Sequence, residues 1–410
     1  MTTITLPRPD GRYERFELSP PPALPVPPGP PRSRVVYAAA HVVADPLSDT
    51  TPDAPARLNW DATLAFRHHL WDLGLGVADA MDTAQRGMGL TWDTCAELIR
   101  RSAAEAAGRG ARIAVGVGTD HAAADLPDTK AVLDAYREQL EVVVPTGATP
   151  ILMASRQLVR AARGPEDYLE VYGQLLDDLP DGAILHWLGP MFDPALAGYW
   201  GAADVAVATD HVLALIERHA DRVQGVKVSL LDLDHEVDLR RRLPEGVRLF
   251  TGDDFHYPEL IEGDAQGYSD ALLGILDPIA PVAAAALQAL DAGDRDRYRE
   301  LLAPTVPLAR HVFGAPTKYY KVGIVFLAWL AGHQAAFAMV GGLASGRSLP
   351  HLAETFRLAD RAGLLPDPEL AAARMRALLV VHGLDGGAVS GGIGPMMPLE
   401  GPIAVSEEGT

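Results

Sequence analysis

The sequence predicts a closed (β/α)8 barrel, an α/β fold, and three observations support this. Short runs rich in β-branched residues alternate with longer segments of helical periodicity, the pattern of consecutive βα units and a parallel sheet. Eight such runs follow one another, and each precedes a segment that can form a helix. The chain has 410 residues, which is long for one core but within the range of these barrels.

Eight short apolar runs are the predicted strands of the barrel. In chain order they cover residues 34–43, 76–81, 112–118, 149–155, 183–188, 225–230, 248–252 and 271–276. The segments between them carry apolar residues at helical spacing, with N-cap candidates in front, as in WDATLAFRHHLWDLG and TDHVLALIERHADR. We therefore expect the barrel to span residues 34–290.

Both ends of the chain differ from the barrel in composition. Residues 1–33 contain SPPPALPVPPGPPRS, and prolines favour an extended polyproline II arm because they lack an amide donor. Residues 291–382 continue as one helical pattern after another, which predicts a C-terminal helical extension. Residues 383–410 are rich in Gly and Pro, so we expect a second extended tail there.

Composition and charge argue against several classes of function. The net charge of −19 and a pI near 5.0 disfavour attraction to nucleic acid or to anionic membranes. The single cysteine, Cys95, cannot form an internal disulfide or a cysteine-based metal site. The sequence shows no signal-peptide pattern and no long uncharged apolar run, so a cytoplasmic enzyme without membrane or nucleic-acid partners is the expectation.

Polar residues follow the predicted strands at the end where active sites of this fold lie. In chain order they are His41, Asp82 and Thr83, Asp120 and His121, Ser155 and Arg156, His186, Lys227, and Asp253 and Asp254. Several of them, taken alone, have structural explanations such as helix caps or surface loops. Together they predict a polar site at this end of the barrel.

Lys227 is the residue of this set that is hardest to explain as structural. Strand alternation in GVKVSL places Lys227 on the face opposite its two valine neighbours, which predicts that it points into the barrel. A buried ammonium is costly, and a lysine that loses its proton becomes a nucleophile that can form a Schiff base with a carbonyl. The structural alternative is a lysine paired with Asp82 or Asp253 across the barrel.

The segment VQGVKVSLLDLD, followed about 20 residues later by RLFTGDDFHY, resembles a known pair of motifs. They are the Schiff-base lysine strand and the Gly-Asp-Asp turn of the dihydrodipicolinate synthase and N-acetylneuraminate lyase superfamily. AILHWLGPMFDP and LDAGDRDRYRELLAPTVPLARHVF resemble further segments of that superfamily in the same order. The resemblance covers roughly residues 33–335 and implies a class I aldolase or lyase that needs no cofactor or metal and forms a homodimer or homotetramer.

The resemblance also implies roles for individual residues. Lys227 takes the place of the Schiff-base lysine, and His186 replaces a strand tyrosine that shuttles protons. A histidine suits that work because its ordinary pKa lies near 6.5. The residues expected to bind substrate are Thr83, Asp82, His41, Arg156, Gly252 and Asp253.

The turn that holds the substrate carboxylate in that superfamily is altered here. Thr83 matches its first threonine, but Ala84 replaces the second threonine, Asp82 the preceding glycine and Arg86 the glutamate. The site for an α-keto-acid carboxylate is thus altered relative to that superfamily. The resemblance implies a keto acid as substrate, and the many polar strand ends indicate a polyhydroxylated carbonyl compound.

The sequence thus predicts a Schiff-base-forming class I aldolase or lyase, or a related dehydratase. One alternative is a metal-dependent aldolase, isomerase or hydrolase that uses the His and Asp residues at the strand ends, although no HxH, HxxxH or ExxH spacing supports it. A second alternative is a catalytically degenerate binding protein, for which the altered turn is the argument. The interior lysine beside a histidine on the next strand favours the enzyme.

Overall fold

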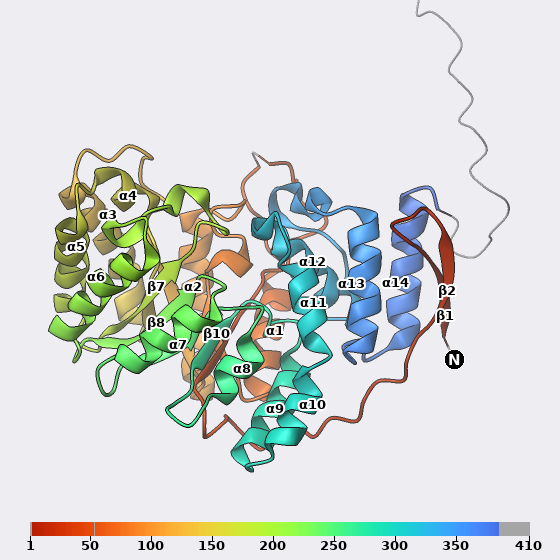
Figure 1. Ribbon diagram of the computed structural model, residues 1–410. Helices are drawn as coiled ribbons and strands as arrows, with labels where there is room; N and C mark the ends of the chain where they lie inside the picture. Colours follow the sequence, from red (N-terminus) through yellow and green to blue (C-terminus); the bar gives the residue numbers. More distant parts are fainter. Residues whose placement is uncertain (1, 53, 385–410) are drawn as a thin grey trace, which may run out of the picture.

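A closed barrel of eight parallel strands forms the centre of the computed structural model, which describes residues 2–52 and 54–384 (Figure 1). The strands are β3 (Val36–Ala39), β4 (Gly76–Asp79), β5 (Ile113–Val117), β6 (Thr149–Leu152), β7 (Ala183–Leu188), β8 (Val223–Ser229), β9 (Arg248–Thr251) and β10 (Asp270–Leu273). Neighbours in sequence are neighbours in the sheet, and β10 pairs with β3 to close it. Every strand overlaps a predicted apolar run, with β8 and β10 beginning one or two residues earlier than predicted, and the (β/α)8 fold is confirmed.

Helices between the strands cover the outside of the barrel. They are α1 (Trp60–Asp72), α2 (Trp92–Arg109), α3 (Thr129–Val143), α4 (Arg156–Ala161), α5 (Pro165–Asp177), α6 (Val205–Arg218), α7 (Leu233–Arg242), α8 (Tyr257–Glu262) and α9 (Ala280–Asp291). The side chains of Asn59, Asp128, Asp204 and Asp232 accept backbone N–H bonds at the starts of α1, α3, α6 and α7. These caps explain where the helices begin, because the first N–H groups of a helix have no partner inside it.

Apolar side chains fill the barrel interior toward the amino ends of the strands. Tyr37, Ile184 and Phe250 belong to one buried cluster contributed by different strands. Gly225 leaves room for this layer, since a Cβ there would lie 2.6 Å from the ring of Phe250. Apolar side chains therefore fill the barrel beneath Lys227, and the space for a ligand next to Lys227 lies at the carboxyl end of the strands.

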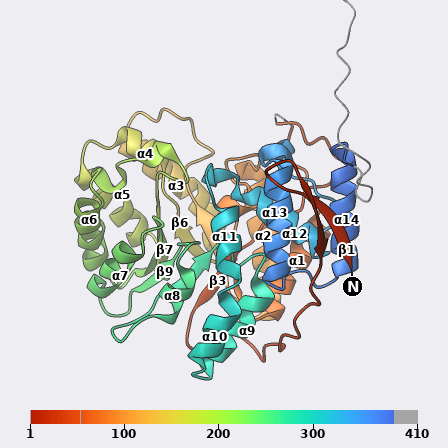
Figure 2. The same cartoon turned by 45° about the vertical axis from the view of Figure 1, so that its right-hand side comes forward.

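Further helices after the barrel pack beside it on one side of the molecule (Figures 1 and 2). They are α10 (Arg295–Leu302), α11 (Thr305–Val312), α12 (Tyr320–Leu330), α13 (Leu349–Arg361) and α14 (Pro368–Val381). Helix α12 is buried along its whole length and contacts the short 3-10 turn η1 (Asp82–Ala84) that follows β4. The extension therefore reaches the end of the barrel where the polar residues gather.

The N-terminal segment lies along these C-terminal helices. Strands β1 (Thr3–Pro7) and β2 (Tyr13–Glu17) form an antiparallel hairpin beside α13 and α14 (Figure 2). Arg357 of α13 donates to the carbonyl of Pro7 at 2.7 Å, and the backbone N–H of Ser33 donates to Asp291 at 2.8 Å. The expected arm thus contains a hairpin and packs on its own chain.

The tail expected over 383–410 lies outside the described residues except for its first two positions. Within the described part of the chain, no helix combines the length and the apolar character needed to cross a membrane.

Candidate active site

Lys227 lies inside the barrel near the carboxyl end of β8. It pairs in register with His186 of β7 and Phe250 of β9, and its two valine neighbours pack outward in the core beneath the helices. The residue is 8% exposed, and its amine forms no hydrogen bond or ion pair with any described residue. The inward orientation expected from strand alternation is confirmed, and the expected alternative of an ion pair is absent among these residues.

Two adjoining hollows open at this end of the barrel. The inner one is about 20 Å³ and is lined by Lys227, Thr83, Asp254 and Tyr320 among others, so it has room for about one water-sized group. The outer one is about 330 Å³, a size typical of small-molecule sites, and its polar lining includes Arg86, Arg156 and His186. Asp82 and Leu188 line both hollows and mark the boundary between them.

Burial lowers the pKa of Lys227 from its ordinary value, and the negative charges of Asp82 and Asp254 oppose that shift. Burial raises the pKa of Asp254 to about 7, although the N–H of Ile275 and the charge of Lys227 act in the other direction. The two groups interact, so their protons belong to the pair. A lysine of lowered pKa beside an acid of raised pKa supplies both a nucleophile and a proton donor near neutral pH.

His186 occupies the expected place beside Lys227, but its protonation differs from the expectation. Burial, with the nearby positive charge of Lys227, holds the pKa of His186 well below its ordinary value. Its Nε2 lies 3.4 Å from the hydroxyl of Ser229, and its Nδ1 has no partner among the described residues. The argument from an ordinary histidine pKa is therefore wrong, because the burial that brings His186 to the site also keeps it neutral.

Thr83 forms a hydrogen bond with the hydroxyl of Tyr320 at 2.9 Å. Tyr320 begins helix α12, is buried, and stacks on the ring of Phe313 with centroids 4.3 Å apart. Burial and the charge of Asp82 raise the pKa of Tyr320 well above its ordinary value, so the hydroxyl keeps its proton. Sequence reasoning missed this residue because nothing in the helical extension relates it by spacing to a strand end.

The Gly-Asp-Asp turn after β9 places one aspartate in the site and the other outside it. Asp254 lines the inner hollow, while Asp253 caps the turn by accepting the backbone N–H groups of Phe255 and His256. Gly252 lies directly against the lysine, since a Cβ there would be 3.0 Å from the Cε of Lys227. Gly252 thus makes room for Lys227, and Asp253 lines neither hollow.

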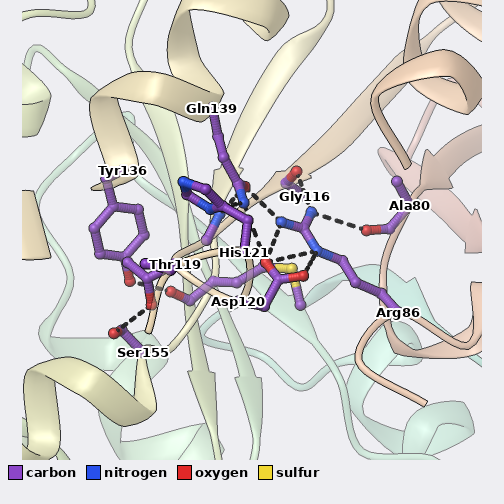
Figure 3. A network of polar contacts seen from close by, with 12 residues as sticks. Ala80, Arg86, Gly116, Thr119, Asp120, His121, Tyr136, Gln139 and Ser155 are labelled. Atoms are coloured by element: carbon purple, nitrogen blue, oxygen red, sulfur yellow. Dashed lines mark hydrogen bonds and ion pairs between the residues drawn. The ribbon is translucent and has the colours of Figure 1, made fainter. Parts of the chain in front are cut away.

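Arg86 lies at the wall of the outer hollow, held by a network of polar contacts (Figure 3). Its Nε and Nη2 atoms bond to the carboxylate of Asp120, and Nη2 also bonds to Gln139. Its Nη1 donates to the carbonyls of Ala80 at 3.2 Å and Gly116 at 2.7 Å. Burial, the largest single effect, lowers the pKa of Arg86, but the charge and hydrogen bonds of Asp120 together with smaller contributions such as the charge of Asp82 outweigh it, and the pKa is raised.

His41 and Arg156 lie in different places from the one expected for substrate contacts with Lys227. His41 is fully buried, bonds through Nδ1 to Asp277 at 2.8 Å, and lines neither hollow. Arg156 lines the outer hollow at the start of α4 and pairs with Asp193. The structure therefore brings Arg156 to the mouth of the site and directs His41 elsewhere.

No group of three or more His, Cys, Asp or Glu side chains within residues 2–52 and 54–384 could hold a metal ion. His121 bonds instead to Glu138 and Gln139, and His256 bonds to Asp253. The metal-dependent alternative thus lacks a ligand set in the described part of the chain.

A family profile described as "Protein of unknown function (DUF993)" matches residues 4–384. No curated protein matches the chain significantly.

Among solved structures, the dihydrodipicolinate synthase of Thermotoga maritima is similar with a TM-score of 0.58, 16% identity, and coverage of 81% of this chain and 99% of that one. The dihydrodipicolinate synthase of Aquifex aeolicus has a TM-score of 0.56 and 13% identity, with coverage of 87% of this chain and 100% of that one. The enzyme of Oceanobacillus iheyensis has a TM-score of 0.53 and 14% identity, with coverage of 72% of this chain and 86% of that one. The resemblance seen in the motifs is therefore confirmed in the fold.

Proposed function

The chain belongs to the family described as "Protein of unknown function (DUF993)", and we propose that it is a Schiff-base-forming lyase or aldolase that acts through Lys227. The observation that carries the proposal is the amine of Lys227, which lines the inner hollow without a partner among the described residues. Burial lowers its pKa, which increases the fraction of neutral amine. The similar structures named dihydrodipicolinate synthase support this class of reaction by analogy of fold.

The reaction begins when the neutral amine of Lys227 adds to the carbonyl carbon of the substrate. The carbonyl oxygen becomes a hydroxyl and leaves as water after it accepts a proton, which gives a cationic imine. Asp254 is the acid for this step because it lines the same small hollow and its pKa of about 7 keeps it partly protonated near neutral pH.

The cationic imine then acts as an electron sink. In C–C cleavage the β-hydroxyl loses its proton and becomes a carbonyl, and the electron pair of the Cα–Cβ bond moves toward the imine and leaves an enamine; the reverse movement forms the bond. In a dehydration, loss of an α-proton gives the enamine, which expels the β-hydroxyl as water after that hydroxyl accepts a proton. The hydrogen-bonded hydroxyls of Tyr320 and Thr83 lie beside this hollow and transfer protons to and from the substrate. Neutral His186 orients the substrate as a hydrogen-bond partner, and Arg156 contacts its distal end in the outer hollow. Water releases the product from Lys227.

The test is reduction with borohydride in the presence of a panel of aldehydes, ketones, keto acids and keto sugars. We expect a reduced adduct on the peptide that contains Lys227 and no adduct in Lys227→Met. The matched control is Lys321→Met, because Lys321 is a second buried lysine with a pKa lowered by burial. An adduct that disappears in Lys321→Met would contradict the assignment.

A panel that binds but leaves no adduct would favour the catalytically degenerate alternative. The expected homodimer or homotetramer is part of the proposal, and analytical ultracentrifugation tests it. Monomer alone at micromolar concentration would contradict that part.

A further inference from the structure

We infer that the site takes an uncharged, hydroxylated aldehyde or ketone and discriminates against α-keto acids, and that Asp82 sets this preference. The inference rests on the proposed Schiff base at Lys227. In an α-keto acid the carboxylate carbon is bonded directly to the carbonyl carbon, so the carboxylate must lie one bond from the imine carbon. Discrimination against an α-keto acid therefore depends on which charged groups and hydrogen-bond donors of the protein are free beside the imine carbon.

The arginines that line the outer hollow do not offer a free guanidinium to the carbonyl end of a substrate. Each N–H donor of Arg86 has a protein acceptor, so its guanidinium has none left for a substrate carboxylate (Figure 3). Arg156 pairs with Asp193, and Arg160 donates to the carbonyl of Ala124 at 2.8 Å. Arg156 keeps N–H donors for the distal end of a substrate, but neither Arg156 nor Arg160 lines the inner hollow where the carbonyl carbon lies.

Three backbone amides of the turn after β4 are also used within the protein. The backbone N–H groups of Ala84 and Arg86 donate to the carbonyl of Met81, and that of Gln85 donates to the carbonyl of Asp82. The segment is wound into the 3-10 turn η1, and these three amides are used inside the turn. A carboxylate that approached the turn would find the backbone N–H groups of Ala84, Gln85 and Arg86 occupied.

Asp82 is the charged group that remains free at the junction of the two hollows. Its carboxylate forms no ion pair or hydrogen bond with any described residue, and it lines both hollows. Its negative charge acts to raise the pKa values of Lys227, Lys321 and Tyr320. Lys321 forms no ion pair with Asp82, because its ammonium donates to the carbonyl of Lys318 at 3.2 Å and to the sulfur of Met88 at 3.5 Å.

A carboxylate at this junction repels a substrate carboxylate and accepts hydrogen bonds from hydroxyl groups. The inner hollow admits only a small reacting end, and the polar outer hollow accommodates the rest of the molecule. These properties match a carbonyl compound whose neighbouring carbon carries a hydroxyl group.

The experiment compares hydroxyacetone with pyruvate, two methyl ketones that differ in a hydroxymethyl group against a carboxylate. The rate of borohydride-trapped adduct on Lys227 is measured by mass spectrometry for each. Each rate is divided by that of Nα-acetyl-lysine under the same conditions. We expect hydroxyacetone to be favoured by about tenfold or more in the native protein, the effect of a like-charge contact of roughly 1.4 kcal/mol.

In Asp82→Asn we expect the ratio of the two rates to fall toward one, because the repulsion of pyruvate is removed. The ratio cancels any change in the pKa of Lys227, and adduct formation with hydroxyacetone reports that the variant is folded. Asp125→Asn, which removes the same charge from an exposed loop residue, should keep the native ratio.

Pyruvate reacting as fast as hydroxyacetone in the native protein would overturn the inference and leave the Schiff base intact. A preference that survives in Asp82→Asn would overturn the role of Asp82. Absence of adduct on Lys227 with either compound and with the whole panel would overturn the proposed function, and the inference with it.

Discussion

Gly252→Ala is the substitution that most directly tests the placement of Lys227. A Cβ at this position would lie 2.2 Å from the hydroxyl of Ser229, 2.6 Å from the carbonyl oxygen of Val228 and 3.0 Å from the Cε of Lys227. The hydroxyl can rotate, but that carbonyl accepts the N–H of Gly252 at 2.7 Å and belongs to the barrel sheet. The added methyl must therefore displace backbone.

Overpacking of this kind costs about 1–3 kcal/mol of stability. We expect the midpoint of urea unfolding to fall accordingly, and the rate of trapped adduct on Lys227 to fall as well because the lysine side chain is pushed from its position. The matched control is Gly108→Ala on the exposed surface of α2, where a Cβ meets nothing within 4 Å. It should stabilise the protein by up to about 1 kcal/mol, since Ala is the better helix former.

Urea unfolding followed by circular dichroism measures the stability of both variants, and peptide mass spectrometry measures the adduct. An unchanged unfolding midpoint and an unchanged adduct rate in Gly252→Ala would refute the placement of Lys227 against the β9 turn. A loss of stability in Gly108→Ala equal to that in Gly252→Ala would refute the role of the local contacts.

Three further predictions concern protons. Tyr320→Phe removes the hydrogen bond to Thr83, so we expect about 10²-fold slower turnover with little change in adduct formation; equal losses in both would contradict a proton-transfer role. In the native protein we expect the rate of adduct formation to decline above pH about 7, where Asp254 ionises. In Asp254→Asn a pH–rate profile should no longer show this decline. Glu236, buried against the hydroxyls of Thr251 and Ser269, has its pKa raised from 4.5 to about 8. Between these values the folded state holds a proton that the unfolded state has lost, so stability falls as pH rises through this window. In Glu236→Gln we expect the free energy of unfolding, measured with urea, to change much less with pH over this window. Because each pKa unit is worth about 1.4 kcal/mol, the variant should be the more stable protein by a few kcal/mol above pH about 8. Parallel plots of the free energy of unfolding against pH for the two proteins would contradict this prediction.

The barrel could be predicted because its information is local. Each strand is a short apolar run followed by a helical pattern, and eight consecutive repeats leave few topologies open. The inward direction of Lys227 follows from the same local rule, since alternate residues of a strand face opposite sides. These features depend on neighbours within a few positions along the chain.

The contents of the site could be predicted only in part. Lys227, His186 and Thr83 lie in or just after predicted strands, and all three line the hollows. Tyr320 comes from a helix 237 positions beyond Thr83, its hydrogen-bond partner, and no sequence pattern pointed to it. Asp254 and Asp253 are adjacent in the sequence, yet only Asp254 faces the lysine, because the turn uses Asp253 as its cap. Neighbouring residues of the same type acquire different roles from backbone geometry that no pattern of letters encodes.

The sequence by itself determined the fold class and the position of an interior lysine, because both follow from periodicity and from the cost of burying a charge. Only the tertiary structure decided which groups surround that lysine and which charges are free. Arg86 is fully bonded, His186 is neutral and Asp82 is unpaired among the described residues. These properties depend on burial and on partners brought together from distant parts of the chain, and they set the chemistry of the site.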